Sequence, residues 1–333
     1  MLHDFASRRA SIRHLAAWLA VGILAALAVS CSPLTPNVTG SGAVDGAGET
    51  RIWDVHASRF VSEADVVAQL ASIRFRLLGE VHDNPLHHEI RARLLRAIAA
   101  SGRRPGVVME QFDLDNDAFL IAAQSPGADA EQVAQAGRLD RKAWLWPLHK
   151  PIIQAALEMH LPIRAGNLAR TSLRAGAETA AWDDAGIGSA RLHAARWTQA
   201  QASLLQQDIE SSHCGRLPPA LVPRIVLAQR MRDAAMAQAL VNAATSDGAI
   251  LIAGDGHVRS DLGVPVYLHA GKLPEADSGS LSVGFIDVSP ENETATDFPR
   301  AVVARNPGFD YVWLTPSPVR EDPCERMPAP KAS

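Results

Sequence analysis

Short apolar runs alternate with longer amphipathic segments along most of the chain. Nearly continuous apolar runs predict buried strands, at residues 75–78, 106–110, 161–167 and 249–253. Apolar residues at helical spacing predict core-facing helices, at residues 64–73, 85–100, 117–124 and 150–159. Strands that alternate with helices in this way are typical of an α/β fold, with a mainly parallel sheet and flanking helices.

Two parts of the chain depart from this alternation. Residues 171–245 contain two long helical patterns, at 190–211 and 219–244, which predict an inserted helical hairpin or cap. Nearer the C-terminus, three apolar runs are separated by glycine, proline and asparagine, and their spacing leaves little room for crossover helices. We therefore expect antiparallel C-terminal strands, at residues 264–268, 282–288 and 311–314.

Residues 1–30 have the anatomy of a signal peptide. Arginines precede an apolar run at residues 15–29, and small residues follow it. The run is about fifteen residues long, whereas a membrane-spanning helix needs about twenty, so we expect cleavage. The residues directly before Cys31 resemble a bacterial lipobox, in which the cysteine becomes the first residue and carries lipid, palmitate included. An ordinary secretory cleavage site is the alternative.

A lipidated Cys31 would place the protein in the bacterial cell envelope. Residue 32 is serine rather than the aspartate associated with inner-membrane retention, which favours the outer membrane, with the protein facing the periplasm. Residues 31–50 are rich in small and polar side chains and predict a flexible tether. One folded domain is expected over residues 51–325, followed by a disordered tail at 326–333.

The charge and cysteine content narrow the set of partners. The formal net charge is −4 and no basic run follows the signal, so nucleic acid is not expected as a partner. Three cysteines are present, and a lipidated Cys31 leaves Cys214 and Cys324 as the pair available in an oxidising compartment. We predict a disulfide between them, with two unpaired thiols as the alternative.

Four residues with acid–base or metal-binding chemistry lie at or just beyond predicted strand ends: Glu80, His82, Glu110 and His257. The carboxyl ends of parallel strands share one edge of a sheet, so we expect these side chains to gather there. As a set they are able to hold a divalent metal ion or to activate water for hydrolysis. Taken singly, each has an ordinary structural interpretation, as a helix cap, a loop acid or a buried imidazole.

A second candidate segment comes directly before a predicted helix. Trp144, Trp146 and His149 place two indoles and an imidazole together, which would suit a flat apolar ligand. Packing in the core or in a lid is the alternative. Further along, the stretch Gln229-Arg230-Met231-Arg232-Asp233 lies in a helix rich in alanine and methionine, and we interpret an arginine and the aspartate of this stretch as a structural ion pair at the buried end of the helix.

Together these stretches resemble the ChaN-like haem-binding lipoproteins, a family linked to iron uptake in the superfamily of Tiki proteases and erythromycin-esterase-like enzymes. The motifs that carry the resemblance run through nearly the whole mature chain: Gly79-Glu80-Val81-His82-Asp83-Asn84-Pro85, His87-His88, Val108-Met109-Glu110, Trp144-x-Trp146, Gly166-Asn167, His213-Cys214-Gly215, Gln229-Arg230-x-Arg232-Asp233 and Gly254-x-Gly256-His257-x-Arg259. The resemblance implies an α/β fold and haem binding near Trp144, Trp146 and His149, with His82 and Arg259 as further contacts. In some relatives it implies dimers that enclose two stacked haems.

The chain departs from the family pattern at one position. The family segment Trp-x-Trp-x-x-Tyr-x-Pro supplies a tyrosine that ligates haem iron, and His149 stands at that place here. Because imidazole is a common axial ligand, we expect His149 to ligate the iron.

The leading prediction is therefore a lipid-anchored, non-enzymatic haem-binding protein linked to haem and iron uptake, with a homodimer allowed. The alternative is a metal-dependent hydrolase of the Tiki or erythromycin-esterase type that uses Glu80, His82, Glu110 and His257. A structural envelope lipoprotein that binds neither ligand is a third interpretation.

Overall fold

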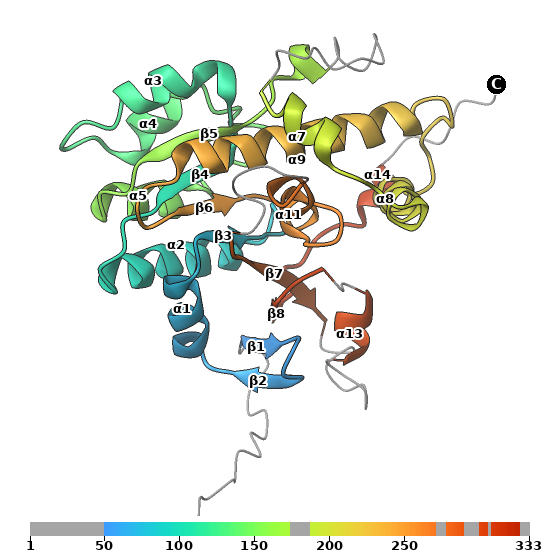
Figure 1. The fold of residues 1–333 in the computed structure, drawn as a ribbon, viewed down its shortest axis with the longest axis horizontal. Helices are drawn as coiled ribbons and strands as arrows, with labels where there is room; N and C mark the ends of the chain where they lie inside the picture. Colours follow the sequence, from blue (N-terminus) through green and yellow to red (C-terminus); the bar gives the residue numbers. More distant parts are fainter. Residues whose placement is uncertain (1–49, 174–186, 271–277, 290–299, 306–307, 327–333) are drawn as a thin grey trace, which may run out of the picture. The chain divides into compact units, whose positions relative to one another are not determined.

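The computed structural model describes residues 50–173, 187–270, 278–289, 300–305 and 308–326 (Figure 1). The predicted signal peptide lies outside these residues, and so does Cys31, the cysteine predicted to carry lipid. Nearly all of the predicted tether and of the predicted tail also lie outside them. The described strands form an eight-stranded sheet in the order β2-β1-β8-β7-β3-β6-β4-β5. They are β1 (Arg51–Asp54), β2 (Arg59–Val61), β3 (Phe75–Leu78), β4 (Gly106–Asp113), β5 (Ile163–Asn167), β6 (Ala249–Ile252), β7 (Ser280–Val288) and β8 (Tyr311–Pro316).

Helices connect most of these strands. They are α1 (Glu63–Ser72), α2 (Pro85–Ala100), α3 (Asp117–Ala122), α4 (Ala130–Ala136), α5 (Lys150–Glu158), α7 (Ser189–Ala194), α8 (Gln199–Ser212), α9 (Val222–Ala243), α10 (Asp255–Val258), α11 (Val264–Leu268), α13 (Arg300–Arg305) and α14 (Pro323–Arg326), with a 3₁₀ turn at Leu114–Asn116. The predicted α/β class is confirmed, and α2 has the predicted bounds.

Two hydrophobic cores bury both faces of the sheet. In β4, Val107 and Met109 pack into one core with α1, α2, α4 and α5, whereas Val108 packs into the other with α7, α9 and α11. Figure 1 shows strands β3, β6, β4 and β5 between helix α2 and helix α9. Because both faces are covered, the central strands are apolar throughout, which is why the sequence marks them so clearly.

The C-terminal strands differ from the prediction in their pairing. Strand β7 pairs in parallel with β3 and β8, and helix α13 lies in the connection between β7 and β8. The predicted antiparallel edge exists, but it forms where β8 meets β1 and β1 meets β2. Strands β1 and β2 were not predicted, because three or four residues give too little alternation to identify a strand.

Two further predictions change in the structure. Residues 264–268 form helix α11 rather than a strand, since a short run that is buried all round has no diagnostic period and Pro265 favours the first helical turn. The predicted helical hairpin is present as α8 and α9, but α9 packs on β4, β5 and β6. Helix α9 therefore belongs to the layer that covers the sheet.

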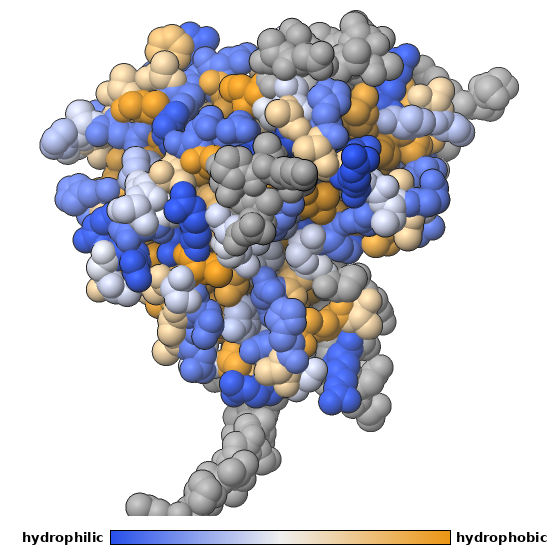
Figure 2. Space-filling view, in the orientation of Figure 1, coloured by the Kyte–Doolittle hydropathy of each residue, from blue (hydrophilic) through white to orange (hydrophobic). Residues whose placement is uncertain are grey.

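The surface in view mixes hydrophobic and hydrophilic residues. Figure 2 shows hydrophobic residues on this face interspersed with hydrophilic ones. Among the described residues, no helix combines the length and the apolar character that crossing a membrane would require.

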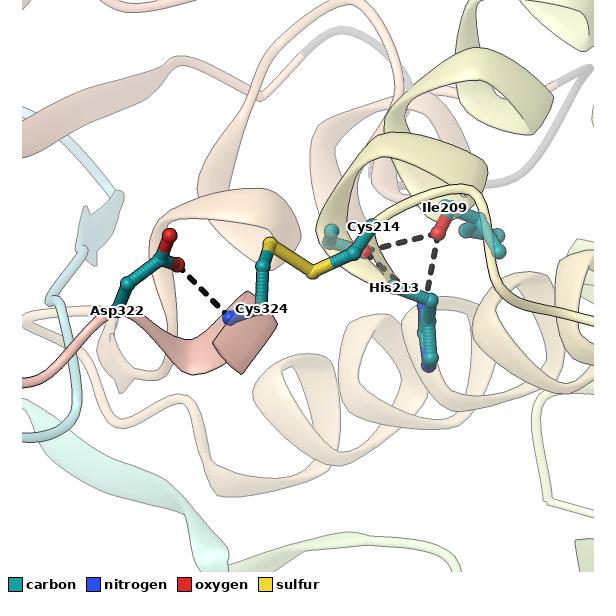
Figure 3. The surroundings of a disulfide bond; sticks show 6 residues. Ile209, His213, Cys214, Asp322 and Cys324 are labelled. Atoms are coloured by element: carbon teal, nitrogen blue, oxygen red, sulfur yellow. Dashed lines mark hydrogen bonds between the residues drawn. A yellow bond between two sulfur atoms is a disulfide. The ribbon is translucent and has the colours of Figure 1, made fainter. Parts of the chain in front are cut away.

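The predicted disulfide joins Cys214, in the turn after α8, to Cys324 in α14 (Figure 3). Arg320, in the same C-terminal segment, forms ion pairs with Asp83 at 2.7 Å and Asp287 at 2.6 Å. The segment after β8 is thus fastened to the helical layer and to the loop that follows β3.

Replacing Cys324 by serine should lower the free energy of unfolding by about 2–5 kcal/mol, because the bond closes a long loop and restricts the unfolded chain. Urea unfolding of the oxidised wild type and of Cys324→Ser measures this difference. Wild type reduced with a dithiol is the matched control and should unfold like the variant. Equal midpoints for the oxidised wild type and the variant would contradict the expectation.

Candidate functional site

A cleft of about 600 Å³ opens beside the carboxyl ends of β3, β4 and β5. Its walls come from the loop after β3, from β4, from the segment after β5, from α9 and from the stretch that follows α4. Its lining includes His82, Glu110, Gln111, Asp113, Arg138, Asp140, Trp144, Leu168, Arg170 and Arg232. This volume lies in the range of small-molecule sites, which is roughly 300–1,000 Å³.

Glu80 and His82 form a carboxylate–imidazole pair at the end of β3. His82 Nδ1 lies 2.7 Å from Glu80 Oε1, and Gln111 Nε2 donates to the same oxygen at 3.2 Å. The Glu80 side chain has no exposed surface, whereas that of His82 is 46% exposed. Because a carboxylate only accepts, the Nδ1 nitrogen carries a hydrogen, and in the neutral tautomer of the ring this leaves the lone pair on Nε2.

Two glycines allow this pair to form. A Cβ on Gly254 would lie 2.9 Å from the His82 ring, and one on Gly79 would lie 2.0 Å from Asp255 Oδ1. Both glycines are therefore required by close approach of side chains rather than by an unusual backbone angle. The glycines in the two sequence motifs explain how the strand ends come so near each other.

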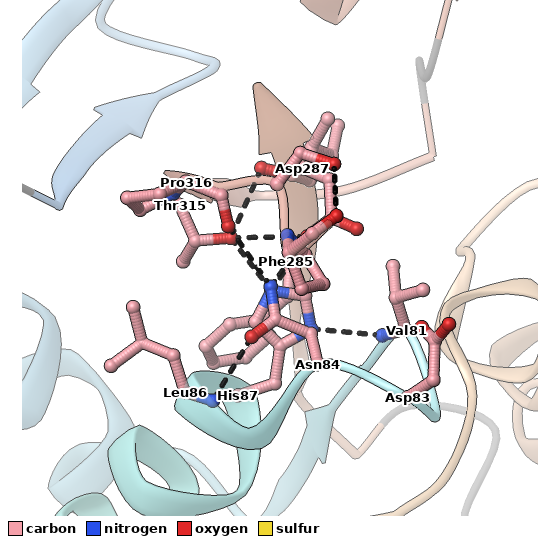
Figure 4. Close-up of polar contacts among 12 residues, drawn as sticks. Val81, Asp83, Asn84, Leu86, His87, Phe285, Asp287, Thr315 and Pro316 are labelled. Atoms are coloured by element: carbon pink, nitrogen blue, oxygen red, sulfur yellow. Dashed lines mark hydrogen bonds and ion pairs between the residues drawn. The ribbon is translucent and has the colours of Figure 1, made fainter. Parts of the chain in front are cut away.

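The loop that carries His82 is anchored by polar groups behind it (Figure 4). Asn84 caps helix α2 by accepting from the Leu86 amide, and its own amide donates to Asp287. His87 Nδ1 accepts from the Val81 amide, and its Nε2 donates to Thr315. These contacts restrict the movement of the loop, so the position of His82 is set before any ligand arrives.

His257 lies between two buried carboxylates. Its Nδ1 is 2.5 Å from Asp233 and its Nε2 is 3.2 Å from Glu110, which also accepts from the Gly254 amide. Burial alone would lower the pKa of His257, but the Glu110 and Asp233 charges outweigh it and raise the pKa to about 10. Burial alone would raise the pKa of Glu110, yet His257 brings that pKa below its usual value. His257 is therefore an imidazolium at neutral pH.

Arg91, His88 and His149 form the inner wall behind Glu80. Arg91 contacts Glu80 Oε2, and its Nη2 also donates to His88 Nδ1 at 2.9 Å. Burial lowers the pKa of His88 to about 4 and that of His149 to about 2, so both imidazoles are neutral. Neither nitrogen of His149 has a hydrogen-bond partner among the described residues.

Glu80, His88 and His149 are close enough together to be considered as metal ligands, with their ligand atoms within 4.8 Å of one another. Arg91, however, already holds the free oxygen of Glu80 and the free nitrogen of His88. A dication at this place would lie beside a buried guanidinium and would be repelled by it. The geometry therefore favours Arg91 as the resident cation of this cluster.

The structure brings together some of the predicted site residues and separates others. His82, Glu110 and Trp144 line the cleft, with Trp144 packed edge-on against His82, and His257 lies directly behind Glu110. Trp146 donates to Glu131, and Arg259 pairs with Asp208 and Asp261, and neither of the two lines the cleft.

His149 has no exposed surface, so a ligand in the cleft would not reach its nitrogens without movement of the surrounding residues.

The residues that sequence analysis missed come mostly from the helical layers. Asp233 pairs with His257, so its interpretation as the partner of a neighbouring arginine is wrong. Arg232 lines the cleft instead, together with Arg138 and Arg170. The motif Gln229-Arg230-x-Arg232-Asp233 was the available signal, but its helical periodicity did not show which way each charge faces.

Comparisons with known proteins identify the family and the fold. Residues 66–268 match the family model described as haem-binding uptake, Tiki superfamily, ChaN. The solved structure titled cofacial heme binding to ChaN of Campylobacter jejuni is 20% identical, covers 80% of this chain and 97% of that chain, and has a TM-score of 0.63. The structure of the type III effector HopBA1 is 12% identical over 66% of this chain and 81% of that one, and its TM-score of 0.37 is too low to carry an argument. No curated protein matches the chain.

The charge state of His257 is directly measurable. Because its pKa in the folded protein is raised to about 10, the stabilisation from the protonated ring is complete below its ordinary value of about 6.5 and is lost as the pH rises through about 10. The ¹⁵N shifts of Nδ1 and Nε2 should remain those of an imidazolium at pH 8. Asp233→Asn removes one flanking charge and should lower this pKa, and neutral-ring shifts at pH 8 in the wild type would refute the assignment.

Proposed function

The chain belongs to the ChaN family of haem-binding uptake proteins in the Tiki superfamily, and from this premise we propose that it binds haem in the cleft beside His82. The observation that carries the proposal is the orientation of the His82 ring. Its Nδ1 hydrogen is bound to the buried Glu80 carboxylate, and its partly exposed side chain lines the cleft. An imidazole that binds a metal usually donates its other nitrogen to a carboxylate in this way.

Part of the cleft wall suits the flat apolar face of a ligand, while most of the lining residues are polar or charged. Trp144 and Leu168 offer apolar surface beside His82, and the volume of about 600 Å³ is large enough for a drug-sized or cofactor-sized molecule. Haem is therefore compatible with the residues present. When bound, haem would supply an iron centre with an open coordination position for an axial ligand.

The residues around the cleft would have different roles in haem binding. His82 presents Nε2, while Glu80 fixes the ring orientation and the tautomer. Gln111 and Arg91 hold Glu80 in place from the interior. His257 is protonated and has both nitrogens on carboxylates, so it serves the electrostatics of the cleft and not the iron.

The family tyrosine has no direct replacement in the cleft. Tyr267 is buried and its hydroxyl accepts from Arg230, while Tyr311 begins strand β8, and neither lines the cleft. His149, which takes that position in the sequence, is the competing candidate for the axial ligand, and only a movement of the inner wall would expose it.

Haemin titration of purified single variants separates the two histidines. His82→Ala should remove the shifted Soret band and weaken haemin binding at least about tenfold, because the ligand nitrogen is lost. His149→Leu keeps the volume of a buried apolar side chain and should bind haemin like the wild type.

Circular dichroism establishes that both variants are folded. Loss of the Soret shift in His149→Leu with its retention in His82→Ala would assign the iron to His149 instead. Retention of wild-type binding in both variants would refute haem ligation in this cleft.

The proposed setting is the bacterial envelope, where the protein would take part in haem and iron uptake. The signal-like N-terminus and the lipobox-like residues before Cys31 support a lipid anchor, and the serine after Cys31 supports the outer membrane and a periplasmic orientation. Mass spectrometry of the N-terminal peptide tests the lipid. The resemblance to a family in which some members form dimers that enclose two haems supports a homodimer, which sedimentation of the haemin-loaded protein tests.

A second candidate function is hydrolysis at the same cleft. The observation that favours it is the pairing of two imidazoles with carboxylates at one edge of the sheet, which is the geometry of general acid–base chemistry. His82 would act as the general base, and His257 would supply a fixed positive charge. A metal-dependent hydrolase would in addition need a divalent ion that activates water.

Metal analysis of the purified protein, read beside the haemin titration, distinguishes the two functions. Haem binding predicts a Soret shift that depends on His82 and no stoichiometric divalent metal. Stoichiometric divalent metal without a Soret shift would favour the hydrolase, and removal of that metal with a chelator would then abolish hydrolysis.

A further inference from the structure

Three arginines from separate parts of the fold line the cleft that contains His82. Arg138 follows helix α4, Arg170 follows strand β5 and Arg232 lies on helix α9. They are far apart in the sequence, so only the folded chain brings these three residues to the wall of one cavity. A guanidinium group is the side chain best suited to a carboxylate, because its donors match the two oxygens.

None of these arginines has an ion-pair partner within 4.0 Å among the residues that the structure describes. Some other arginines of this chain are paired, among them Arg93 with Glu63, Arg164 with Asp117 and Arg259 with Asp261. Arg232 Nε is also buried without a hydrogen-bond partner among the described residues. A buried donor without a partner costs about 1–3 kcal/mol, so a group that accepts from it is expected.

The acidic residues of the cleft are mostly occupied elsewhere. Glu110 binds His257 and the Gly254 amide, and Asp140, on the exposed rim, accepts from the Ala143 amide. Asp113 is the remaining acid, and its pKa is raised by burial and by Asp115 although Arg170 and Arg232 oppose the shift. With Glu110 balanced by the protonated His257, three guanidinium charges against the carboxyl groups of Asp113 and Asp140 leave the cleft with an excess of about one positive charge.

Arg138 is kept at a position that does not favour it. It has a φ of 53° and directly follows Gly137, the C-cap of α4, at a place where helices commonly carry glycine. A non-glycine residue in this left-handed conformation costs about 1 kcal/mol or more. Its side chain stacks over the Phe119 ring. The positive charge of Arg138 has no carboxylate partner among the described residues.

We infer that Arg138, Arg170 and Arg232 form a carboxylate-recognition site, and that the ligand class of this cleft is a flat, largely apolar molecule carrying two carboxylate groups. The inference rests on the proposed function for the identity of that molecule as haem, whose two propionates meet the description. The arginines bind the carboxylates and His82 binds the metal, so the two kinds of recognition are separable. A metal-free porphyrin with both carboxylates should also bind.

Binding of four probes to the full mature protein tests this inference: haemin, haemin dimethyl ester, metal-free protoporphyrin and its dimethyl ester. The metal-free pair is followed by porphyrin fluorescence and the haemin pair by the Soret band. Each free diacid should bind at least about tenfold more tightly than its ester, because charge-assisted hydrogen bonds are worth about 1.5–3 kcal/mol. Arg232→Gln and Arg170→Gln should weaken binding of the diacids by a similar factor and leave binding of the esters unchanged.

Arg224→Gln is the matched control, since Arg224 is exposed on the same helix as Arg232 and does not line the cleft. It should bind every probe like the wild type, and thermal unfolding confirms that each variant is folded. The inference would be overturned if diacid and ester bound with equal affinity, or if the arginine variants lost affinity for both by the same factor. A Soret shift that still depended on His82 would in that case support haem binding without the carboxylate site. Binding of the metal-free diacid without any Soret shift with haemin would instead retain the carboxylate site and reject iron ligation.

Discussion

The buried carboxylate of Glu80 is the group on which the arrangement of this site depends. An ionised carboxylate without exposed surface is stable only if its oxygens are satisfied, and here His82, Gln111 and Arg91 share them. Each of these partners comes from a different element, so the carboxylate fixes the relative positions of the β3 loop, strand β4 and helix α2. The same contact sets the tautomer of His82, which connects the stability of the sheet edge with the chemistry that the cleft is able to perform.

Three imidazoles of this site have three different surroundings. His257 is held protonated by two flanking carboxylates, and His149 is held neutral by burial. His82 is the one of the three whose side chain is substantially exposed to the cleft. Residue type alone does not distinguish them, because the state of an imidazole is decided by the charges and solvent around it. The proposed division of roles, with His82 for the ligand and His257 for electrostatics, follows from those surroundings.

The cleft also joins two kinds of recognition that come from different layers of the fold. The strand ends supply His82 and the Glu80 carboxylate that orients it, while helix α9 and the stretches after α4 and β5 supply the arginines and Trp144. Strand ends are held by the sheet ladder and by the glycines that permit close approach, so their side chains are precisely placed. The surrounding segments provide the charge and the apolar wall that decide which molecule fits. Such a division allows a shared fold to serve different ligands in related proteins.

The sequence by itself determined the α/β class, the central strands, the bounds of α2, the cysteine pairing and the gathering of Glu80, His82 and Glu110 at one edge of the sheet. Each of these rests on a local signal, such as an apolar run, a helical period or a glycine at a strand end. Only the tertiary structure decided the parallel pairing of β7 with β8, the helix at residues 264–268, the burial of His149 and the meeting of the three arginines. These features depend on contacts between residues distant in the chain. Where a segment packs between two layers, the spacing of its residues does not show toward which layer each side chain points.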